Sequence, residues 1–398
     1  MSQRKLKILL ISYRFPWPWT RGDTLTVGKM CEYFGSRHEL DLLCGQKAPD
    51  PADEARVRPY VHELKTLPFS RARAALRTGL TAFSSQPFQI GWCNSSALMH
   101  EAAKLNAARH YDVVIAYYIR TAEAAAQLAG PKKVVAMQLS LALQWQRAAK
   151  HAKGPVRRLL SGIEAARLRR YEESMFTRFD RCLIISPHDL KGLSGVQPDK
   201  VIYNPHGVDT QKYRPHPEVA KEPNMIVFSG NMGFQPNEDA VCYFVESIFP
   251  RVLATVPEAK FVIVGKDPTR KVQALAKNPR VEVTGTVPKV EDYLNRAVVG
   301  VDPLRIGGGL QNKVLEGMSM GLPMVVSTVA NEGIGAPEGE GLFMVDEPNT
   351  FADRVIELLR DPTLRERTSI AARSFIERYW TWEYHFQRLE NELQELVA

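Results

Sequence analysis

The amino-acid sequence predicts an α/β protein with two parallel, doubly wound sheets, one in each half of the chain. Short apolar runs of strand length alternate with longer runs of helical spacing in both halves, and this alternation is typical of a parallel sheet covered by helices. Between residues 203 and 224 the chain is rich in proline and turn residues, which indicates a linker between domains. A length of 398 residues also favours two domains over one.

The first half alternates predicted strands with predicted helices. We expect a helix over 25–34 and one long basic helix over 150–173, where the spacing of apolar residues is helical. The predicted strands are apolar and rich in β-branched residues; they are Lys7–Ser12, Glu39–Cys44, Val113–Tyr117, 134–137 and 181–186.

In the second half, glycines follow the predicted strands. The strands are expected at Met225–Ser229, 261–264, 281–284, 298–301 and 324–327. Gly230, Gly265 and Gly285 stand at or just past the ends of the first three, and a glycine triplet follows the fourth. Ligands of open parallel sheets bind at the carboxyl ends of the strands, where the strand order switches. This edge is therefore the predicted binding site, and helices are expected from residue 346 to the end.

The composition is that of an ordinary soluble globular protein, with 44% hydrophobic and 24% charged residues. No apolar run approaches the ~18 residues of a membrane span, and the first apolar run is too short for a signal peptide. The five cysteines are scattered without a C-x-x-C pair, which argues against a zinc site and a disulfide framework. We therefore expect reduced thiols and a cytoplasmic location.

The net charge of +8 is divided unevenly along the chain. Residues 1–209 carry 31 Lys and Arg against 18 Asp and Glu (+13), and residues 210–398 carry 21 against 26 (−5). A basic half beside an acidic half suggests that one half meets an anionic partner, such as a membrane surface, a phosphorylated lipid or nucleic acid. A solvated helix face without a partner explains the same charge equally well.

The stretch over 300–327 carries most of the functional information. A glycine triplet at 307–309 lies between a predicted strand and a predicted helix. Glycines at a helix start let the backbone approach a phosphate, which the free first-turn N–H groups then bind. Lys313 and Glu316 share one face of that helix because they are three residues apart. The alternative is a helix packed on a sheet, with the glycines chosen for steric fit.

Several motifs resemble those of the GT-B glycosyltransferases, in particular the retaining family-4 type. The most specific is KVLEGMSMGLPMVV over 313–326, which resembles the signature K-x-L-E-A-M-A-x-G-x-P-V-V. The sequence PHGVD over 205–209 resembles the motif that ends the N-terminal domain of those enzymes. Segments 14–23 and 229–237 are similar to a subgroup of bacterial sugar transferases from exopolysaccharide gene clusters.

This resemblance implies two Rossmann-like domains that face a cleft. The acceptor domain would cover 1–207, the nucleotide-sugar donor domain 208–377, and a final helix over 378–398 would pack back on the first domain. A UDP- or GDP-sugar would be the co-substrate, without a cofactor, and no metal is implied because no D-x-D motif stands at a strand end. The implied donor-binding residues are Gly230, Asn231, Arg305, Gly308, Gly309, Leu310, Lys313 and Glu316.

The chain departs from the family pattern at the first of two glutamates that are eight residues apart. Glu316 matches the second, but Gly308 stands at the first. Segment 229–237 also lacks the usual Arg and Lys pair that holds the diphosphate, so Lys313 and Arg305 would supply that charge. Glu316 would accept hydrogen bonds from the ribose hydroxyls; the alternative is a surface salt bridge between Glu316 and Lys313.

The resemblance favours retention by attack of the acceptor hydroxyl from the leaving-group side. Lys313 would stabilise the charge that grows on the β-phosphate. Asp23 would orient the acceptor hydroxyl, although a turn residue after Gly22 is the simpler interpretation. Lys313 and Asp23 are thus the candidate catalytic residues, and Gly22, Asp23 and Arg120 are expected on the acceptor side.

The segment over 150–170 is basic and amphipathic. Such a helix can lie on an anionic membrane, which suits a lipid-linked acceptor and a peripheral position on the inner face of the plasma membrane. The alternative is a helix packed on its own sheet with its arginines in solvent. The basic residues are Lys150, Lys153, Arg157, Arg158, Arg167, Arg169 and Arg170.

Two other classes of function are disfavoured by the sequence. A nucleic-acid-binding protein is disfavoured because the basic residues are not interleaved with a stacking platform. A dinucleotide-dependent oxidoreductase lacks its fingerprint, since the first strand is not followed by G-x-G-x-x-G. A GT-B nucleotide-sugar epimerase and a catalytically inactive nucleotide-binding or anion-binding protein remain the alternatives to a polysaccharide glycosyltransferase.

Overall fold

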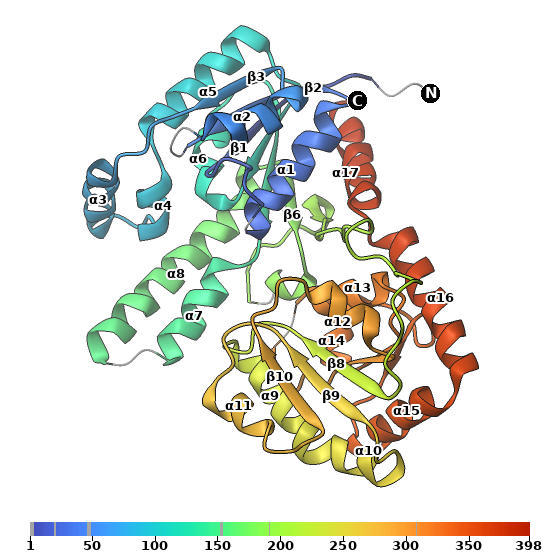
Figure 1. The fold of residues 1–398 in the computed structure, drawn as a ribbon. Helices are drawn as coiled ribbons and strands as arrows, with labels where there is room; N and C mark the ends of the chain where they lie inside the picture. Colours follow the sequence, from blue (N-terminus) through green and yellow to red (C-terminus); the bar gives the residue numbers. More distant parts are fainter. Residues whose placement is uncertain (1–3, 20, 46–48, 152–153, 191, 308) are drawn as a thin grey trace. The chain divides into compact units, whose positions relative to one another are not determined.

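The computed structural model describes residues 4–19, 21–45, 49–151, 154–190, 192–307 and 309–398. The chain forms two compact units (Figure 1). The first comprises Met1–His206 together with Phe386–Ala398, and the second comprises Gly207–His385. The division falls at 206/207 and 385/386, where the sequence had suggested 207/208 and 377/378. None of the helices in the described ranges is long and apolar enough to cross a membrane.

The first unit is built on a seven-stranded parallel sheet with the order β3-β2-β1-β4-β5-β6-β7. The central strands are apolar and buried because helices cover both of their faces. The strands are β1 (Lys7–Ser12), β2 (Glu39–Cys44), β3 (Glu63–Thr66), β4 (Val113–Tyr117), β5 (Lys132–Gln138), β6 (Arg181–Ile184) and β7 (Val201–Tyr203).

The helices of the first unit include two groups that extend from the sheet (Figure 1). One is formed by α3, the short 3-10 helix η2 (Thr81–Phe83) and α4; the other is the hairpin of α7 and α8. The helices are α1 (Gly22–Gly35), α2 (Pro51–Val57), α3 (Arg71–Leu80), α4 (Phe88–Cys93), α5 (Ser96–Arg109), α6 (Ala122–Ala126), α7 (Leu141–His151) and α8 (Pro155–Arg178).

The single long helix expected over 150–173 is wrong. Gly154 adopts a φ of +95°, a conformation that few other residues tolerate, and Pro155 begins the next helix. The basic residues are therefore shared between two helices, with Lys150 near the end of α7 and the arginines on α8. Lys153 lies outside the described residues.

The second unit contains a six-stranded parallel sheet with the order β10-β9-β8-β11-β12-β13. The chain order reverses between β8 and β11, which makes this pair the switch point of the sheet. An aromatic cluster of Phe244, Phe249 and Phe261 lies in its core. The strands are β8 (Met225–Ser229), β9 (Lys260–Val264), β10 (Val281–Gly285), β11 (Val299–Asp302), β12 (Met324–Val326) and β13 (Leu342–Met344).

The helices of the second unit follow its strands in turn, and a π-helical turn over Phe244–Ile248 joins α9 to α10. They are α9 (Gln235–Tyr243), α10 (Phe249–Thr255), α11 (Arg270–Leu275), α12 (Val290–Arg296), α13 (Asn312–Ser319), α14 (Thr328–Asn331), α15 (Pro348–Arg360) and α16 (Pro362–Tyr379), followed by α17 (Trp382–Val397).

Helix α17 begins in the second unit, and its residues from Phe386 onward belong to the first. Within the first unit, Glu390 is buried and accepts a hydrogen bond from the Tyr33 hydroxyl at 2.8 Å. It also lies 2.9 Å from the buried His38 ring. The last turns of the chain are thus part of the first core.

Candidate functional site

The carboxyl ends of β8, β9 and β11 form one cluster of polar residues in the second unit. The loops there approach each other closely: a Cβ atom at Gly265 would lie 1.7 Å from the carbonyl oxygen of Gly230. Gly265 also has a φ of +145°, so this contact requires glycine. The main chain after β8 is thereby fixed at the switch point of the sheet.

Lys313 lies in the first turn of α13 at the centre of this cluster. Its Nζ donates hydrogen bonds to Asn237 Oδ1 and Gln311 Oε1, both at 3.0 Å. The same atom lies 3.2 Å from Asp302 Oδ2, and the Lys313 side chain is only 11% exposed. The ammonium group is therefore held in one position by partners from β11, α9 and the turn before α13.

Asp302 is the buried counter-ion of this lysine. Its side chain is 0% exposed, and burial raises the pKa of the carboxyl group to about 6, while the Lys313 ammonium acts to lower it. A buried carboxylate is costly unless it is paired. We did not predict Asp302 or Asn237 as site residues; the available signal was an acidic residue at the end of an apolar strand.

Gly307 and Gly309 lie between β11 and α13, as the sequence predicted. Helix α13 begins at Asn312, and Gln311 before it has non-helical backbone angles. Gly309 and Leu310 therefore directly precede the first turn; Gly308 lies outside the described residues. Gly309 adopts a φ of +79°, and its carbonyl oxygen would be 2.5 Å from a Cβ at Gly333. Backbone conformation and close packing thus account for a glycine here.

Glu316 lies one turn after Lys313 on α13, but the two side chains do not form an ion pair in the described structure. The Tyr213 hydroxyl donates a hydrogen bond to Glu316, and Lys313 is bound to Asp302 instead. The surface salt bridge considered for Glu316 is therefore wrong. Burial raises the pKa of Glu316 to about 7, with Tyr213 and Lys212 opposing the shift.

The remaining predicted donor residues occupy the loops around α9. The Asn231 carbonyl accepts a hydrogen bond from Asn237 Nδ2 at 2.9 Å, and a Cβ at Gly230 would be 2.8 Å from the same nitrogen. Arg305 has a different partner: its guanidinium forms two hydrogen bonds with Asp239, at 2.6 and 3.0 Å, and lies over the Tyr243 ring. Its charge is therefore already matched by a carboxylate.

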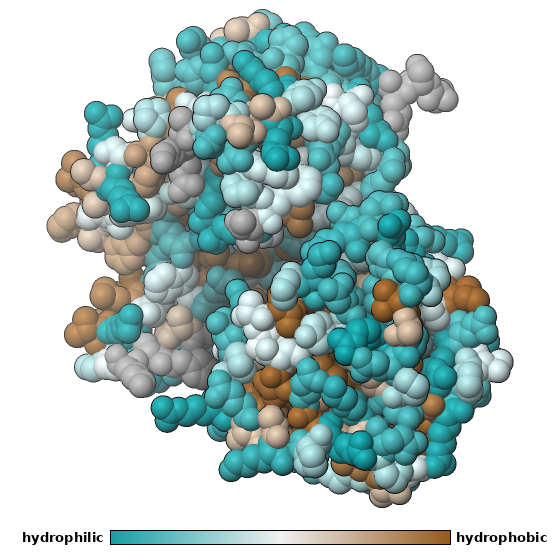
Figure 2. Space-filling view, in the orientation of Figure 1, coloured by the Kyte–Doolittle hydropathy of each residue, from teal (hydrophilic) through white to brown (hydrophobic). Residues whose placement is uncertain are grey.

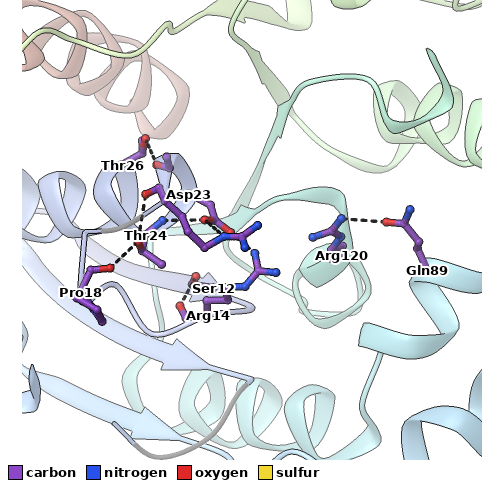
Figure 3. A network of polar contacts seen from close by, with 10 residues as sticks. Ser12, Arg14, Pro18, Asp23, Thr24, Thr26, Gln89 and Arg120 are labelled. Atoms are coloured by element: carbon purple, nitrogen blue, oxygen red, sulfur yellow. Dashed lines mark hydrogen bonds and ion pairs between the residues drawn. The ribbon is translucent and has the colours of Figure 1, made fainter. Parts of the chain in front are cut away.

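A second polar cluster lies in the first unit (Figure 3). Asp23 stands in the first turn of α1, directly after Gly22. It accepts a hydrogen bond from the Thr24 N–H at 3.1 Å and forms ion pairs with Arg14 and Arg21. Asp23 thus begins a helix, where the simpler sequence interpretation had a turn residue, and its charge is matched by arginines.

Arg120 lies near this cluster, in the short helical turn Ile119–Thr121 that follows β4. It donates a hydrogen bond to Gln89 Oε1 at 2.9 Å (Figure 3). Arg14 and Arg120 line one cavity of about 330 Å³ together with residues of α3 and α4. Arg14 thus pairs with Asp23 and shares this cavity with Arg120.

Residues 223–361 match the family model described as glycosyl transferases group 1. This match covers the sheet of the second unit, including β8, β11 and α13. The motif over 313–326, on which the resemblance chiefly rested, lies within it.

Two curated relatives are similar to the chain over different lengths. An uncharacterized 44.6 kDa protein in the cps region of Klebsiella pneumoniae is 19% identical over 381 residues, covering 93% of this chain and 95% of the relative. A GDP-mannose-dependent monoacylated α-(1-6)-phosphatidylinositol monomannoside mannosyltransferase of Corynebacterium glutamicum is 31% identical over 162 residues. That alignment covers 36% of this chain and 41% of the mannosyltransferase.

Solved glycosyltransferase structures share the complete fold. HepE of Anabaena in complex with UDP superimposes with a TM-score of 0.66 at 12% identity, covering 98% of this chain and 100% of HepE. WaaG, a glycosyltransferase of lipopolysaccharide biosynthesis, superimposes with a TM-score of 0.59 at 14% identity, covering 97% of this chain and 99% of WaaG. A glycosyltransferase from Rickettsia africae superimposes with a TM-score of 0.66 at 12% identity, covering 99% of both chains. The predicted class, GT-B with two Rossmann-like parallel-sheet domains, is confirmed.

Proposed function

From the match of residues 223–361 to the model of glycosyl transferases group 1, we propose that this protein is a retaining hexosyltransferase. It moves a sugar from a nucleotide-sugar donor to a glycan or lipid-linked acceptor in bacterial polysaccharide or glycoconjugate synthesis. The observation that carries the proposal is the position of Lys313: one nearly buried ammonium group, fixed at the switch point of the sheet by three partners.

The proposed step transfers the sugar with retention. The acceptor hydroxyl oxygen forms a bond to the anomeric carbon on the side from which the nucleoside diphosphate departs. The bond between that carbon and the β-phosphate oxygen breaks, and the hydroxyl proton passes to the departing phosphate. Negative charge grows on the β-phosphate, so a cation already fixed beside it stabilises the transition state more than the bound donor. Lys313 supplies that charge in a metal-independent reaction.

Glu316 and the loops around it suit the nucleoside part of the donor. A carboxylate accepts two hydrogen bonds from a ribose diol, and the Tyr213 hydroxyl already orients Glu316. The solved relatives include complexes of HepE with UDP and with UDP-glucose, and the mannosyltransferase relative uses GDP-mannose. These names support a UDP- or GDP-sugar as the donor.

The first unit supports a peripheral position on the inner face of the membrane. Its α3–η2 segment and the first turns of α8 expose large apolar side chains, with Phe83 92% exposed; Figure 2 shows apolar side chains along the edge of the unit where Figure 1 draws these helices. Arg167, further along α8, connects this helix to η2 by donating a hydrogen bond to the Thr81 carbonyl at 3.0 Å. The other exposed apolar residues are Leu76, Leu80, Val156, Leu159, Leu160 and Ile163.

Exposed arginines accompany these apolar side chains. The exposed arginines of α8 are Arg157, Arg158, Arg169 and Arg170. Glu164 on the same helix is buried, and its carboxylate accepts hydrogen bonds from the first two N–H groups of α4 at 2.8 and 2.9 Å. Exposed apolar side chains that can insert into a bilayer, flanked by cations that contact its headgroups, suit an anionic membrane. Arg167 is bound to backbone carbonyls, so it supports the fold and is removed from the predicted lipid-contacting set.

The function is tested by donor binding followed by product analysis. UDP-, GDP-, ADP- and dTDP-sugars are compared by thermal shift, because a ligand that binds only the folded protein raises its stability by about 2.7 kcal/mol at a hundredfold excess over Kd. Turnover is then followed with and without acceptor, and the anomeric configuration of the product is determined by NMR. Retained configuration in an acceptor-dependent product is the expected result. Turnover without acceptor would indicate the epimerase, and binding without turnover the inactive binding protein.

A further inference from the structure

The cavity that Arg14 and Arg120 share is a built pocket of the first unit. It opens at the carboxyl edge of the sheet, where Tyr13 and Arg14 follow β1 and Arg120 follows β4. These two strands are paired neighbours at the point where the strand order reverses. The opposite wall comes from the start of α3 and from α4. A pocket of about 330 Å³ at such an edge has the size and place of a ligand site.

The pocket has an excess of positive charge. Arg14, Arg71 and Arg120 line it, and none of the described lining residues is acidic. Arg14 pairs with Asp23. Arg120 donates to the neutral Gln89 amide and lies over the Tyr118 ring, and it forms no ion pair within the described ranges. Arg71 forms no ion pair with a residue of the described ranges. At least two guanidinium charges are therefore available to an anion.

Guanidinium groups and aromatic rings together select a particular kind of anion. Phe69 contacts Trp92, with ring centroids 5.9 Å apart, and Tyr13 at 6.1 Å. Arginine binds phosphate oxygens in pairs, while the aromatic wall contacts whatever apolar or sugar group the phosphate carries. Arg71 also begins α3, whose exposed Leu76 and Leu80 lie further along the same helix.

We propose that this three-arginine pocket (Arg14, Arg71 and Arg120) binds the phosphate or diphosphate group of the acceptor. The inference rests on the proposed function, because it names the class of acceptor that the transferase uses. The shared chemistry is a phosphate ester. A lipid-linked diphosphate has its apolar chain beside α3, whereas a phosphorylated glycan uses the arginines and the aromatic wall alone.

The test measures pyrophosphate binding by calorimetry on the full chain. The donor site is first disabled by the K313A/D302N pair of substitutions, so that the remaining binding reports on the pocket. We expect R71Q and R120Q each to weaken this binding about tenfold, the equivalent of one charge-assisted hydrogen bond. R73Q is the matched control, because Arg73 is an exposed arginine of the same helix that does not line the pocket; we expect it to change Kd less than twofold.

Equal effects of R71Q and R73Q, or no saturable binding of pyrophosphate, would overturn the proposal. Arg71 is exposed at the start of its helix, so R71Q gives a folded variant even if R120Q does not. Farnesyl diphosphate, below its aggregation concentration, distinguishes the two sources: tighter binding than pyrophosphate, reduced by L76Q/L80Q, supports a lipid-linked acceptor, and equal binding supports a phosphorylated glycan. Failure of the transferase function would appear separately, as absence of nucleotide-sugar turnover.

Discussion

Lys313 and the arginines of the first unit are cations of two different kinds. Lys313 is 11% exposed and is held by Asn237, Gln311 and Asp302. The arginines of the three-arginine pocket line a cavity, and Arg157, Arg158, Arg169 and Arg170 on α8 are exposed. A single fixed charge contributes through its position, whereas exposed charges contribute through their number. The two kinds should therefore respond differently to substitution, salt and pH.

The largest effect is expected from K313A. Loss of a fixed cation beside the departing phosphate should lower kcat about a thousandfold, with a smaller change in KM, because the charge it meets grows in the transition state. Steady-state kinetics measures both. An equal change in the two parameters would mean simple ground-state binding, and an unchanged kcat would remove Lys313 from the mechanism.

The same variant tests the burial of the pair. K313A leaves Asp302 without its cation, so Tm should fall. Adding D302N removes the buried charge, and we expect the double variant to recover Tm while kcat stays low. If the double variant were no more stable than K313A, Asp302 would not be the group that makes the lysine necessary to the fold.

The second largest effect concerns the exposed arginines. Neutralising Arg157, Arg158, Arg169 and Arg170 together should lower binding to anionic vesicles about a hundredfold. Each exposed cation contributes ~1 kcal/mol, and Arg169 contributes less because it pairs with Glu173 at 3.3 Å. Binding should weaken with salt, since exposed charges are screened beyond ~8 Å at physiological ionic strength. Nucleotide affinity should stay the same, because the donor residues belong to the second unit.

Co-sedimentation with anionic and neutral vesicles gives the readout. Equal partitioning to both kinds, or to neither, would exclude the electrostatic contact and leave the transferase proposal intact. F83S should weaken binding to anionic vesicles at high salt as well, because it removes apolar contact and no charge.

A smaller effect is expected from E316Q, which should weaken nucleoside diphosphate binding about tenfold. Burial raises the pKa of Glu316 to about 7, so formation of its carboxylate should raise the affinity of the unaltered protein as pH increases through 7, and E316Q should remove this rise. Calorimetry between pH 5.5 and 8.5 measures it. A pH-independent affinity in the unaltered protein would contradict the ribose role of Glu316.

Stability should change in the opposite direction. Because the folded-state pKa is raised from 4.5 to about 7, the folded protein binds the proton more tightly, so stability falls as pH rises from 4.5 to 7 and the full cost of ionising Glu316 is present above pH 7. E316Q should therefore be more stable than the unaltered protein at pH 8, by at most about 3 kcal/mol. The difference should vanish near pH 4.5.

The smallest effect is expected from R305Q. Arg305 is 52% exposed, and its charge is matched by Asp239; exposed pairs contribute about 0–1 kcal/mol. We expect kcat to change less than twofold. A tenfold loss would show that Arg305 leaves Asp239 to meet the diphosphate, and the donor site would then depend on exposed charge as well.

The fold was predictable because strand length, apolar character and glycine position are local properties. The strands at Lys7–Ser12 and Met225–Ser229 appear as expected. The edge strand β3, only half-buried and four residues long, carries no such signal and was missed. The basic helix was placed too early because the break at Gly154 and Pro155 was given less weight than the run of arginines.

The site was predictable only in part. Lys313 and Glu316 belong to one contiguous motif, so the sequence identifies them together. Asn237 is 76 residues from Lys313 in the chain, and Asp302 resembles an ordinary strand end, so their contacts with Lys313 arise only from the tertiary fold. The three-arginine pocket likewise collects residues from four separate segments, between Tyr13 and Arg120.

The buried pair of Asp302 and Lys313 has a consequence for calorimetry. A bound diphosphate attracts the Lys313 ammonium, which then stabilises the Asp302 carboxylate less. The pKa of Asp302 rises from about 6, and the carboxylate takes up a proton from solution. Ribose hydroxyls that donate to Glu316 have the reverse effect, and near pH 7 that group releases one. The heat of nucleotide binding should therefore depend on the ionisation enthalpy of the buffer wherever proton uptake by Asp302 and proton release by Glu316 differ in size.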